Sequence, residues 1–181
     1  NEHTLEKIIF EKTSSLLNSN IIVAKQSSFE ILDQIKKTIS NNQSQKFFFD
    51  KDYTYSLNEN NFFYYEDKLG RLKLPNPNVN GQFQIENIST AIITLRSIKQ
   101  LEIKDEFIKS GITKIHSIAR LQEITRGKLK DLVKNNRLLV DGSHNPLGAK
   151  VLNEYLKSLN CKKHVIIGMM ANKNHHEYFS H

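Results

Sequence analysis

The chain has 181 residues, of which 38% are hydrophobic, and its 26 basic and 19 acidic side chains give a net charge of +7. This length suffices for one domain or for parts of two. The single cysteine excludes a disulfide framework within the chain, and no apolar run is long enough to span a membrane as a helix. The basic residues are scattered among acidic ones rather than clustered. Composition therefore predicts a cytoplasmic protein that binds neither membranes nor nucleic acids.

Helical and strand patterns alternate in the first part of the chain. Apolar residues at helical spacing predict helices over residues 4–17, with Thr4 as N-cap, and over residues 28–39. The short apolar run at residues 20–26 predicts a buried strand between them. Residues 46–75 alternate aromatic and polar side chains between Asn and Gly turns, a composition that predicts two or three antiparallel strands.

Two further helices are predicted before the pattern changes. The apolar stripe of residues 85–100 is typical of an amphipathic helix, and residues 104–111 predict another that ends at a glycine. We place a domain boundary within residues 112–117. The chain is thereby divided into a domain of residues 1–114 and a domain of residues 115–181.

The second domain has the pattern of a parallel sheet. Residues 121–141 indicate a strand, a loop and a second strand, and residues 145–160 indicate a helix with Pro146 in its first turn. Residues 163–170 ("KHVIIGMM") predict another buried strand. A helical crossover of this length joins parallel strands, so the sequence predicts an α/β, Rossmann-like sheet here.

The turn "DGSHNP" at residues 141–146 carries four polar side chains at the expected end of a strand. Ligands of open α/β sheets bind beyond the carboxyl ends of the strands. Asp141 could accept from a ribose hydroxyl or hold an ammonium group, and His144 could position an amine or an oxyanion. Asp, Ser and Asn at this position could instead cap the following helix, which is their commoner use. The pattern alone leaves both interpretations open.

Three other residues are candidates for ligand contacts. Gln84 and Asn87 lie at the predicted start of a helix, where their amides could read the edge of a nucleobase or act only as caps. Arg120 lies between the predicted domains, where its guanidinium could bind a phosphate through two hydrogen bonds or remain solvated. We expect His175 and His176 to be exposed rather than metal ligands, because no partner lies at zinc spacing.

Four stretches, taken in order, resemble the folylpolyglutamate synthase/dihydrofolate synthase family of the Mur ligase superfamily. They are "LPNPNVNGQFQIENISTAI", "ARLQEI", "VDGSHNPLGA" and "IIGMMANKN". The opening "TLEKIIFEK" is also similar to the family's T-L-x-x-I-A-x-E-K stretch. The resemblance implies that residues 1–114 are the C-terminal part of the central ATPase domain, with its antiparallel hairpin. It implies that residues 115–181 are a truncated Rossmann-like C-terminal domain.

The resemblance also assigns roles to six residues. The family's ATP contacts fall on Gln84, Asn87, Arg120 and Asp141. His144 falls where the family keeps a histidine near the incoming glutamate. Lys12 matches a lysine that is carbamylated in family members and then lies near the second magnesium ion.

The implied activity is an ATP-dependent, ADP-forming amide ligase with ATP and Mg²⁺ as cofactors. ATP would phosphorylate the carboxylate of dihydropteroate or a folate, and the amine of L-glutamate would attack the acyl phosphate. The sequence departs from the family at several positions, including Phe83 for His, Ala119 for Gly, and Asn172 and Asn174 for acids. It also contains no G-x-x-x-x-G-K-[ST] loop, which family members carry upstream of the matched region.

Two alternatives stay open beside the ligase interpretation. The chain could be an inactive split-gene or pseudogene remnant, and a separate N-terminal half would be a partner if the gene is split. A basic nucleic-acid-binding domain is the least favoured alternative. Such a domain needs aromatic side chains within a basic face, and the aromatic residues here lie among acids in the hairpin region.

Overall fold

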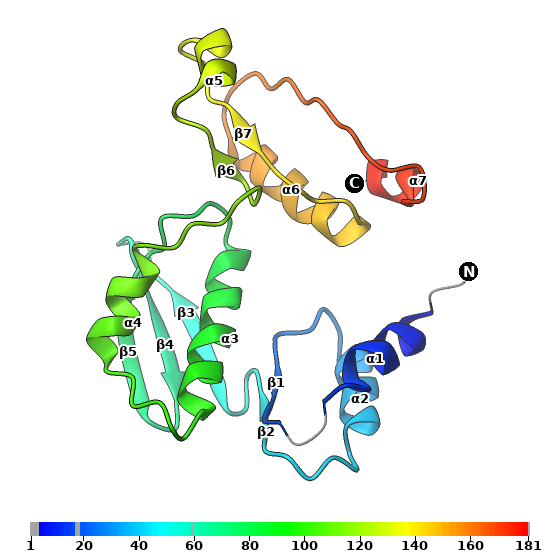
Figure 1. The fold of residues 1–181 in the computed structure, drawn as a ribbon, viewed down its shortest axis with the longest axis vertical. Coiled ribbons are helices and arrows are strands. Elements are labelled where there is room, and N and C mark those ends of the chain that lie inside the picture. The colour runs from blue at the N-terminus through cyan, green and yellow to red at the C-terminus, as the bar shows by residue number, and fades with distance from the viewer. Residues whose placement is uncertain (1–3, 17–18, 59, 181) are drawn as a thin grey trace. The chain divides into compact units, whose positions relative to one another are not determined.

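The structure is a computed structural model in which the chain forms two compact units (Figure 1). The residues that it describes are 4–16, 19–58 and 60–180. Unit 1 takes its residues from 1–76 and 85–112, and unit 2 from 77–84 and 113–181. The segment 77–84 therefore belongs with residues that follow it at a distance in sequence. The assignment of residues 1–114 and 115–181 to two family domains stays a prediction.

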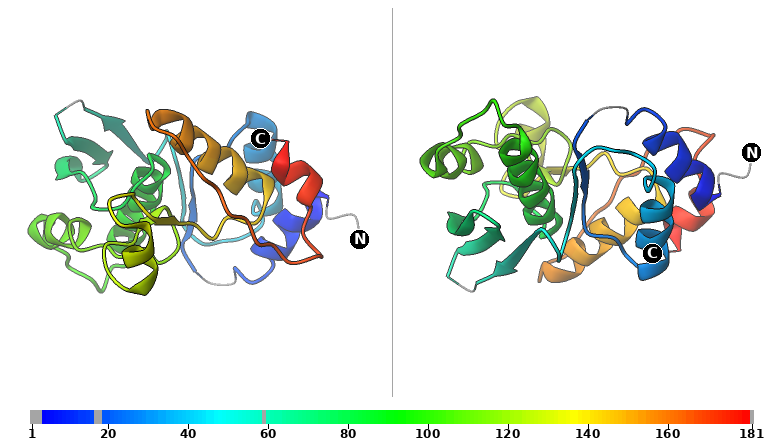
Figure 2. Two further views of the ribbon diagram at one scale, coloured as in Figure 1. Left: turned by 90° about the horizontal axis from the view of Figure 1, so that it is seen from above. Right: turned by 90° about the horizontal axis from the view of Figure 1, so that it is seen from below.

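The first half of unit 1 consists of two helices and a parallel pair of strands. They are α1 (Leu5–Thr13), β1 (Ile21–Val23), α2 (Phe29–Thr38) and β2 (Lys46–Phe48). The Thr4 hydroxyl accepts a hydrogen bond from the Lys7 amide, which confirms the predicted N-cap. Helix α1 packs against α2 (Figure 2). Strand β2 pairs in parallel with β1, so assigning residues 46–48 to the antiparallel region was wrong.

The predicted hairpin region forms a three-stranded antiparallel sheet. Its strands are β3 (Tyr53–Leu57), β4 (Phe62–Asp67) and β5 (Gly70–Pro75), with β4 in the centre. Alternate residues of β4 and β5 point to one face, and Phe63, Tyr65 and Leu74 are fully buried there. The prediction of antiparallel strands is thus confirmed for residues 53–75.

Two helices complete unit 1. Helix α3 (Phe83–Ser97) buries Ile85, Ile88 and Ile92 on one side, as its periodicity predicts. Helix α4 (Asp105–Ile112) lies against β5 (Figure 1) and extends one residue beyond the glycine at which it was predicted to end. Within the described parts of the chain, no helix is long and apolar enough to cross a membrane.

A buried ion pair joins α3 to the turn between β4 and β5. The Arg96 guanidinium lies 2.9 Å from Asp67 and 2.7 Å from Asp105. The Asp67 side chain is 1% exposed and also accepts hydrogen bonds from the Tyr65 hydroxyl and the Leu69 amide. Every partner of this carboxylate is a hydrogen-bond donor, as a buried charge requires.

The Tyr65 hydroxyl makes the stability of unit 1 sensitive to alkaline pH. Burial, and then the hydrogen bond to Asp67, raise the pKa of Tyr65 far above its usual range. The stability that this hydroxyl contributes is therefore complete below the unfolded tyrosine pKa of about 10 and is lost as the pH rises above it. We expect Tyr65→Phe to lower the free energy of unfolding by about 1 kcal/mol at neutral pH. Urea unfolding should show this difference shrinking above about pH 10; a constant difference would contradict the assignment.

Unit 2 contains a short antiparallel pair of strands and three helices. The elements are β6 (Gln122–Glu123), α5 (Lys128–Val133), β7 (Leu139–Val140), α6 (Pro146–Ser158) and α7 (His175–Phe179). Gln122 pairs with Val140, which confirms the predicted strand, loop and strand, with α5 inside the loop. Helix α6 begins at Pro146 as predicted, and α7 packs against it.

The prediction of a buried strand at residues 163–170 was wrong. This segment is not a strand, and the exposed fractions of Val165, Ile166 and Ile167 are 56%, 100% and 43%. A strand needs backbone hydrogen-bond partners, and none of the described residues pairs with this segment. Residues 121–170 thus lack the expected parallel β–α–β unit, and the described residues form a mixed helix and sheet fold.

Candidate functional site

Arg120, Asp141 and His144, three of the predicted site residues, come together in unit 2 at the end of β7. The two carboxylate oxygens of Asp141 accept from two backbone amides. Oδ2 accepts from Leu121 and Oδ1 from Ser143, each at 2.8 Å. Asp141 therefore holds the residue that follows Arg120 as well as its own turn. It is not a cap of α6.

The Arg120 side chain lies beside Gly142. A Cβ atom at Gly142 would lie 3.3 Å from Arg120 Nη1 and 3.3 Å from the Ala119 carbonyl oxygen. The Gly142 amide donates to that same carbonyl at 2.8 Å. The absence of a side chain at position 142 thus lets the turn of residues 119–121, here called the Arg120 turn, approach the end of β7 closely.

The Arg120 turn has an unusual backbone. Ala119 and Leu121 are both left-handed, with φ of 51° and 48°, a conformation that costs about 1–2 kcal/mol for each non-glycine residue. Two side chains help to hold it: the Ala119 amide donates to Gln122 Oε1 at 3.0 Å, and Asn80 Nδ2 donates to the Leu121 carbonyl at 2.8 Å. Hydrogen bonds of about 0.5–1.5 kcal/mol each, and more for the charged Asp141, offset the strain.

Asn80 and Gln122 are functional candidates that the sequence reasoning missed. Gln122 follows Arg120 by two residues in "ARLQEI", but no pattern marks it as a partner of the backbone, and Asn80 lies 40 residues before Arg120 in a polar loop. The backbone groups that they bind are accessible to them because Ala119 and Leu121 have left-handed backbone conformations. A sequence signal for that conformation would be glycine or asparagine, and neither residue type occupies these two positions.

His144 and Asn145 follow in the same turn with different roles. The Asn145 side chain accepts from the Gly148 amide at 2.8 Å, so the capping interpretation holds for this residue. His144 is exposed, and its Nδ1 lies 3.0 Å from the Gly142 carbonyl oxygen. Because a carbonyl only accepts, Nδ1 carries the proton in the neutral ring and leaves a lone pair on Nε2.

A small pocket lies next to the Arg120 turn in unit 2. Its volume is about 160 Å³. Its polar lining includes a guanidinium, an imidazole, several amides and one carboxylate, the last of which is paired with Arg137; these groups belong to Asn78, Asn80, His116, Arg120, Gln122 and Glu123. Complete small-molecule sites usually enclose roughly 300–1,000 Å³. This pocket therefore has room for one part of a ligand, such as a phosphate or a single ring.

The other predicted site residues lie on other elements. Gln84 is buried at the start of α3 and belongs to unit 2, whereas Asn87 is exposed one turn into that helix and belongs to unit 1. Lys12 is exposed in α1, with Glu11 Oε1 at 3.6 Å from its Nζ. The described residues contain no group of three His, Cys, Asp or Glu side chains that could hold a metal ion. The roles of Gln84, Asn87 and Lys12 stay predictions.

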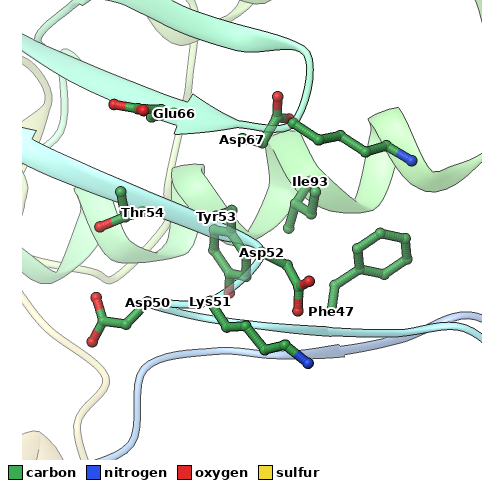
Figure 3. A pocket seen from close by; sticks show the side chains of 10 residues that line it. Phe47, Asp50, Lys51, Asp52, Tyr53, Thr54, Glu66, Asp67 and Ile93 are labelled. Carbon is green, nitrogen blue, oxygen red and sulfur yellow. The ribbon is translucent and has the colours of Figure 1, made fainter.

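A larger pocket in unit 1 is lined by several carboxylates, two of which are held by partners within the fold. It has a volume of about 280 Å³ and is lined by side chains that include Asp50, Asp52, Glu66 and Asp67. Figure 3 shows Asp50 and Asp52 pointing to opposite sides of their turn. Asp52 accepts from the Phe48 amide and Asp67 is paired with Arg96. These two carboxylates therefore serve the fold.

Solved structures of known proteins share the fold of this chain. No model of a protein family and no curated protein matches the sequence. FolC of E. coli, solved in complex with DHPP and ADP, is 24% identical with a TM-score of 0.79, and the match covers 97% of this chain and 39% of FolC. The bifunctional folylpolyglutamate synthase/dihydrofolate synthase of Yersinia pestis is 22% identical with a TM-score of 0.79, covering 99% and 40%.

A structure of a bifunctional synthase with Mn, AMPPNP and L-glutamate bound matches at 21% identity and a TM-score of 0.78, covering 99% of this chain and 40% of that one. The chain thus spans about two fifths of the length of the solved proteins it matches. It has the mixed helix and sheet fold of the corresponding part of folylpolyglutamate synthase structures.

Proposed function

We propose that this chain is part of an ATP-dependent, ADP-forming amide ligase that adds L-glutamate to dihydropteroate or a folate. The observation that carries the proposal is the packing of Arg120 against the Asp141–Gly142 turn. This arrangement occurs in a fold shared with proteins solved with ADP or AMPPNP. The L-glutamate in one of these structures supports the choice of the amino-acid substrate.

Each of the three grouped residues has a chemical role in this proposal. Arg120 binds phosphate oxygens of ATP through its fork of N–H donors. Asp141 supports nucleotide binding indirectly, because its carboxylate accepts from the backbone amide of Leu121, next to Arg120. His144 offers the Nε2 lone pair to the ammonium group of the incoming glutamate.

The reaction would proceed in two steps. The γ-phosphoryl group passes from ATP to the substrate carboxylate and leaves ADP, and the glutamate amine then attacks the acyl carbon. Phosphate departs, the amine loses a proton, and an amide remains.

The 181-residue chain by itself is expected to have no ligase activity. The sequence contains no G-x-x-x-x-G-K-[ST] loop, and a ligase of this type needs backbone N–H groups and a lysine to hold the β- and γ-phosphates. The test is an assay for ATP-dependent addition of radiolabelled glutamate to dihydropteroate and to a folate. Turnover by the purified chain, absent from a parallel preparation of Arg120→Ala, would contradict this expectation.

Nucleotide binding tests the proposed function directly. We expect the chain to bind ADP in the presence of Mg²⁺ and Arg120→Ala to weaken that binding by roughly 10- to 100-fold, the value of a charged hydrogen bond. Isothermal titration calorimetry measures both affinities. Arg71→Ala is the matched control, because it removes the same charge from the exposed face of β5 in unit 1. Failure of the chain to bind ADP, or equal losses in the two variants, would contradict the proposal.

A further inference from the structure

The geometry points to Asn80, Gln122 and Asp141 as positioning residues that hold Arg120 ready for an anion. They do so through the backbone of the Arg120 turn, and we call the set of hydrogen bonds the Arg120 clamp. The inference rests on the proposed function only for the identity of the anion, a nucleotide phosphate. The resemblance to the ligase family assigns no role to Asn80 or Gln122.

The clamp binds every backbone polar group of the two residues that flank Arg120. The Ala119 amide donates to Gln122 Oε1, and the Ala119 carbonyl accepts from the Gly142 amide. The Leu121 amide donates to Asp141 Oδ2, and the Leu121 carbonyl accepts from Asn80 Nδ2. The bond from Gln122 is local, and the other three come from Asn80 and from residues 141–142, which are distant in sequence. The position of Arg120 is therefore set largely by contacts distant in sequence.

The buried Leu121 side chain adds a fifth restraint. It is 1% exposed, so the residue cannot swing outward without exposing apolar surface. Arg120 itself is exposed between two left-handed residues. A turn of this conformation persists only where its surroundings over-determine it, and such strain is found at ligand sites.

The clamp explains why Asp141 supports anion binding although it is itself an anion. A carboxylate near a bound phosphate repels it, and hydrogen bonds from neutral donors weaken that repulsion without removing the charge. Here each carboxylate oxygen already accepts from a backbone amide, at Leu121 and at Ser143. The benefit to the ligand is a fixed backbone at Arg120, because less conformational entropy of the turn is then lost on binding.

Backbone dynamics at Arg120 in the ligand-free chain test the clamp. We expect the backbone N–H vector of Arg120 to be ordered in the wild type and its NMR order parameter to fall below about 0.6 in Asn80→Ala and Gln122→Ala. Amide hydrogen exchange at Leu121 should accelerate by up to about tenfold, the value of one lost hydrogen bond. Asn145→Ala is the control, because it removes a helix-cap bond in the same unit without touching the clamp. A disordered Arg120 in the wild type, or equal changes in all three variants, would overturn the inference.

A double-mutant cycle in ADP binding, with Mg²⁺ present, separates positioning from direct contact. Gln122→Ala should weaken ADP binding about tenfold when Arg120 is present. It should have no further effect when it is combined with Arg120→Ala. Losses that add in the double variant would overturn the positioning role. Failure of the wild type to bind ADP would count against the proposed function alone, since the Arg120 order parameter judges the clamp without nucleotide.

Discussion

Replacing Arg96 with methionine should lower the free energy of unfolding of unit 1 by about 3–5 kcal/mol. The methionine retains most of the apolar stem but leaves the Asp67 carboxylate, which is 1% exposed, without its cationic partner. The remaining donors to Asp67 are the Tyr65 hydroxyl and the Leu69 amide, and neither carries a charge. Asp105 also loses a partner, but its side chain is half exposed and becomes solvated.

Urea unfolding followed by circular dichroism measures this loss. Lys37→Met is the matched control, because it breaks an ion pair with Asp33 on the exposed face of α2 in the same unit. Solvent screens that pair, so its loss should be hard to detect. If Arg96→Met were no more destabilising than Lys37→Met, the Asp67–Arg96 pair would not hold α3 to the sheet.

The elements that the sequence predicted correctly are those determined by nearby residues. Thr4 caps α1, and the apolar spacing of α3 selects its buried side, because a helix satisfies its own backbone. The alternation in residues 53–75 likewise specifies which side chains of the sheet point inward. Each of these patterns can be read without knowing what the segment packs against.

The errors concern strands whose partners lie elsewhere. Residues 46–48 and 163–170 are both apolar and strand-like in the sequence. The first pairs in parallel with β1, while no described residue pairs with the second. An apolar run has the same composition in either case, so only the position of a neighbouring strand distinguishes them.

The candidate site also has one part that the sequence predicted and one part that it did not. The "DGSHNP" turn was recognisable because a strand end, a glycine and a helix cap occur within six residues. The Arg120 clamp was not recognisable in the sequence. Its bonds join Asn80, Gln122 and Asp141 to a left-handed backbone, and alanine and leucine at positions 119 and 121 do not indicate that conformation. Residue types at a site can be predicted where they are contiguous, and their geometry cannot.

The helix that follows this turn should not tolerate a side chain at Gly148. A Cβ atom there would lie 2.7 Å from Ser143 Cβ and 3.3 Å from Asn145 Oδ1, so the turn would have to move. Alanine favours a helix over glycine by about 1 kcal/mol, whereas overpacking costs about 1–3 kcal/mol. The displaced Ser143 would also strain its bonds to Asp141 and to the Tyr178 hydroxyl. We therefore expect Gly148→Ala to destabilise unit 2.

Gly111 provides the matched comparison for that substitution. It lies within α4, and nothing lies within 4 Å of the position its Cβ would take. Gly111→Ala should therefore raise the free energy of unfolding of unit 1 by up to about 1 kcal/mol through helix preference alone. Thermal and urea unfolding of both variants should give changes of opposite sign. Since the residue change is identical, stabilisation by Gly148→Ala as well would mean that the turn at residues 141–146 has room to yield, and that Ser143 does not fix its position.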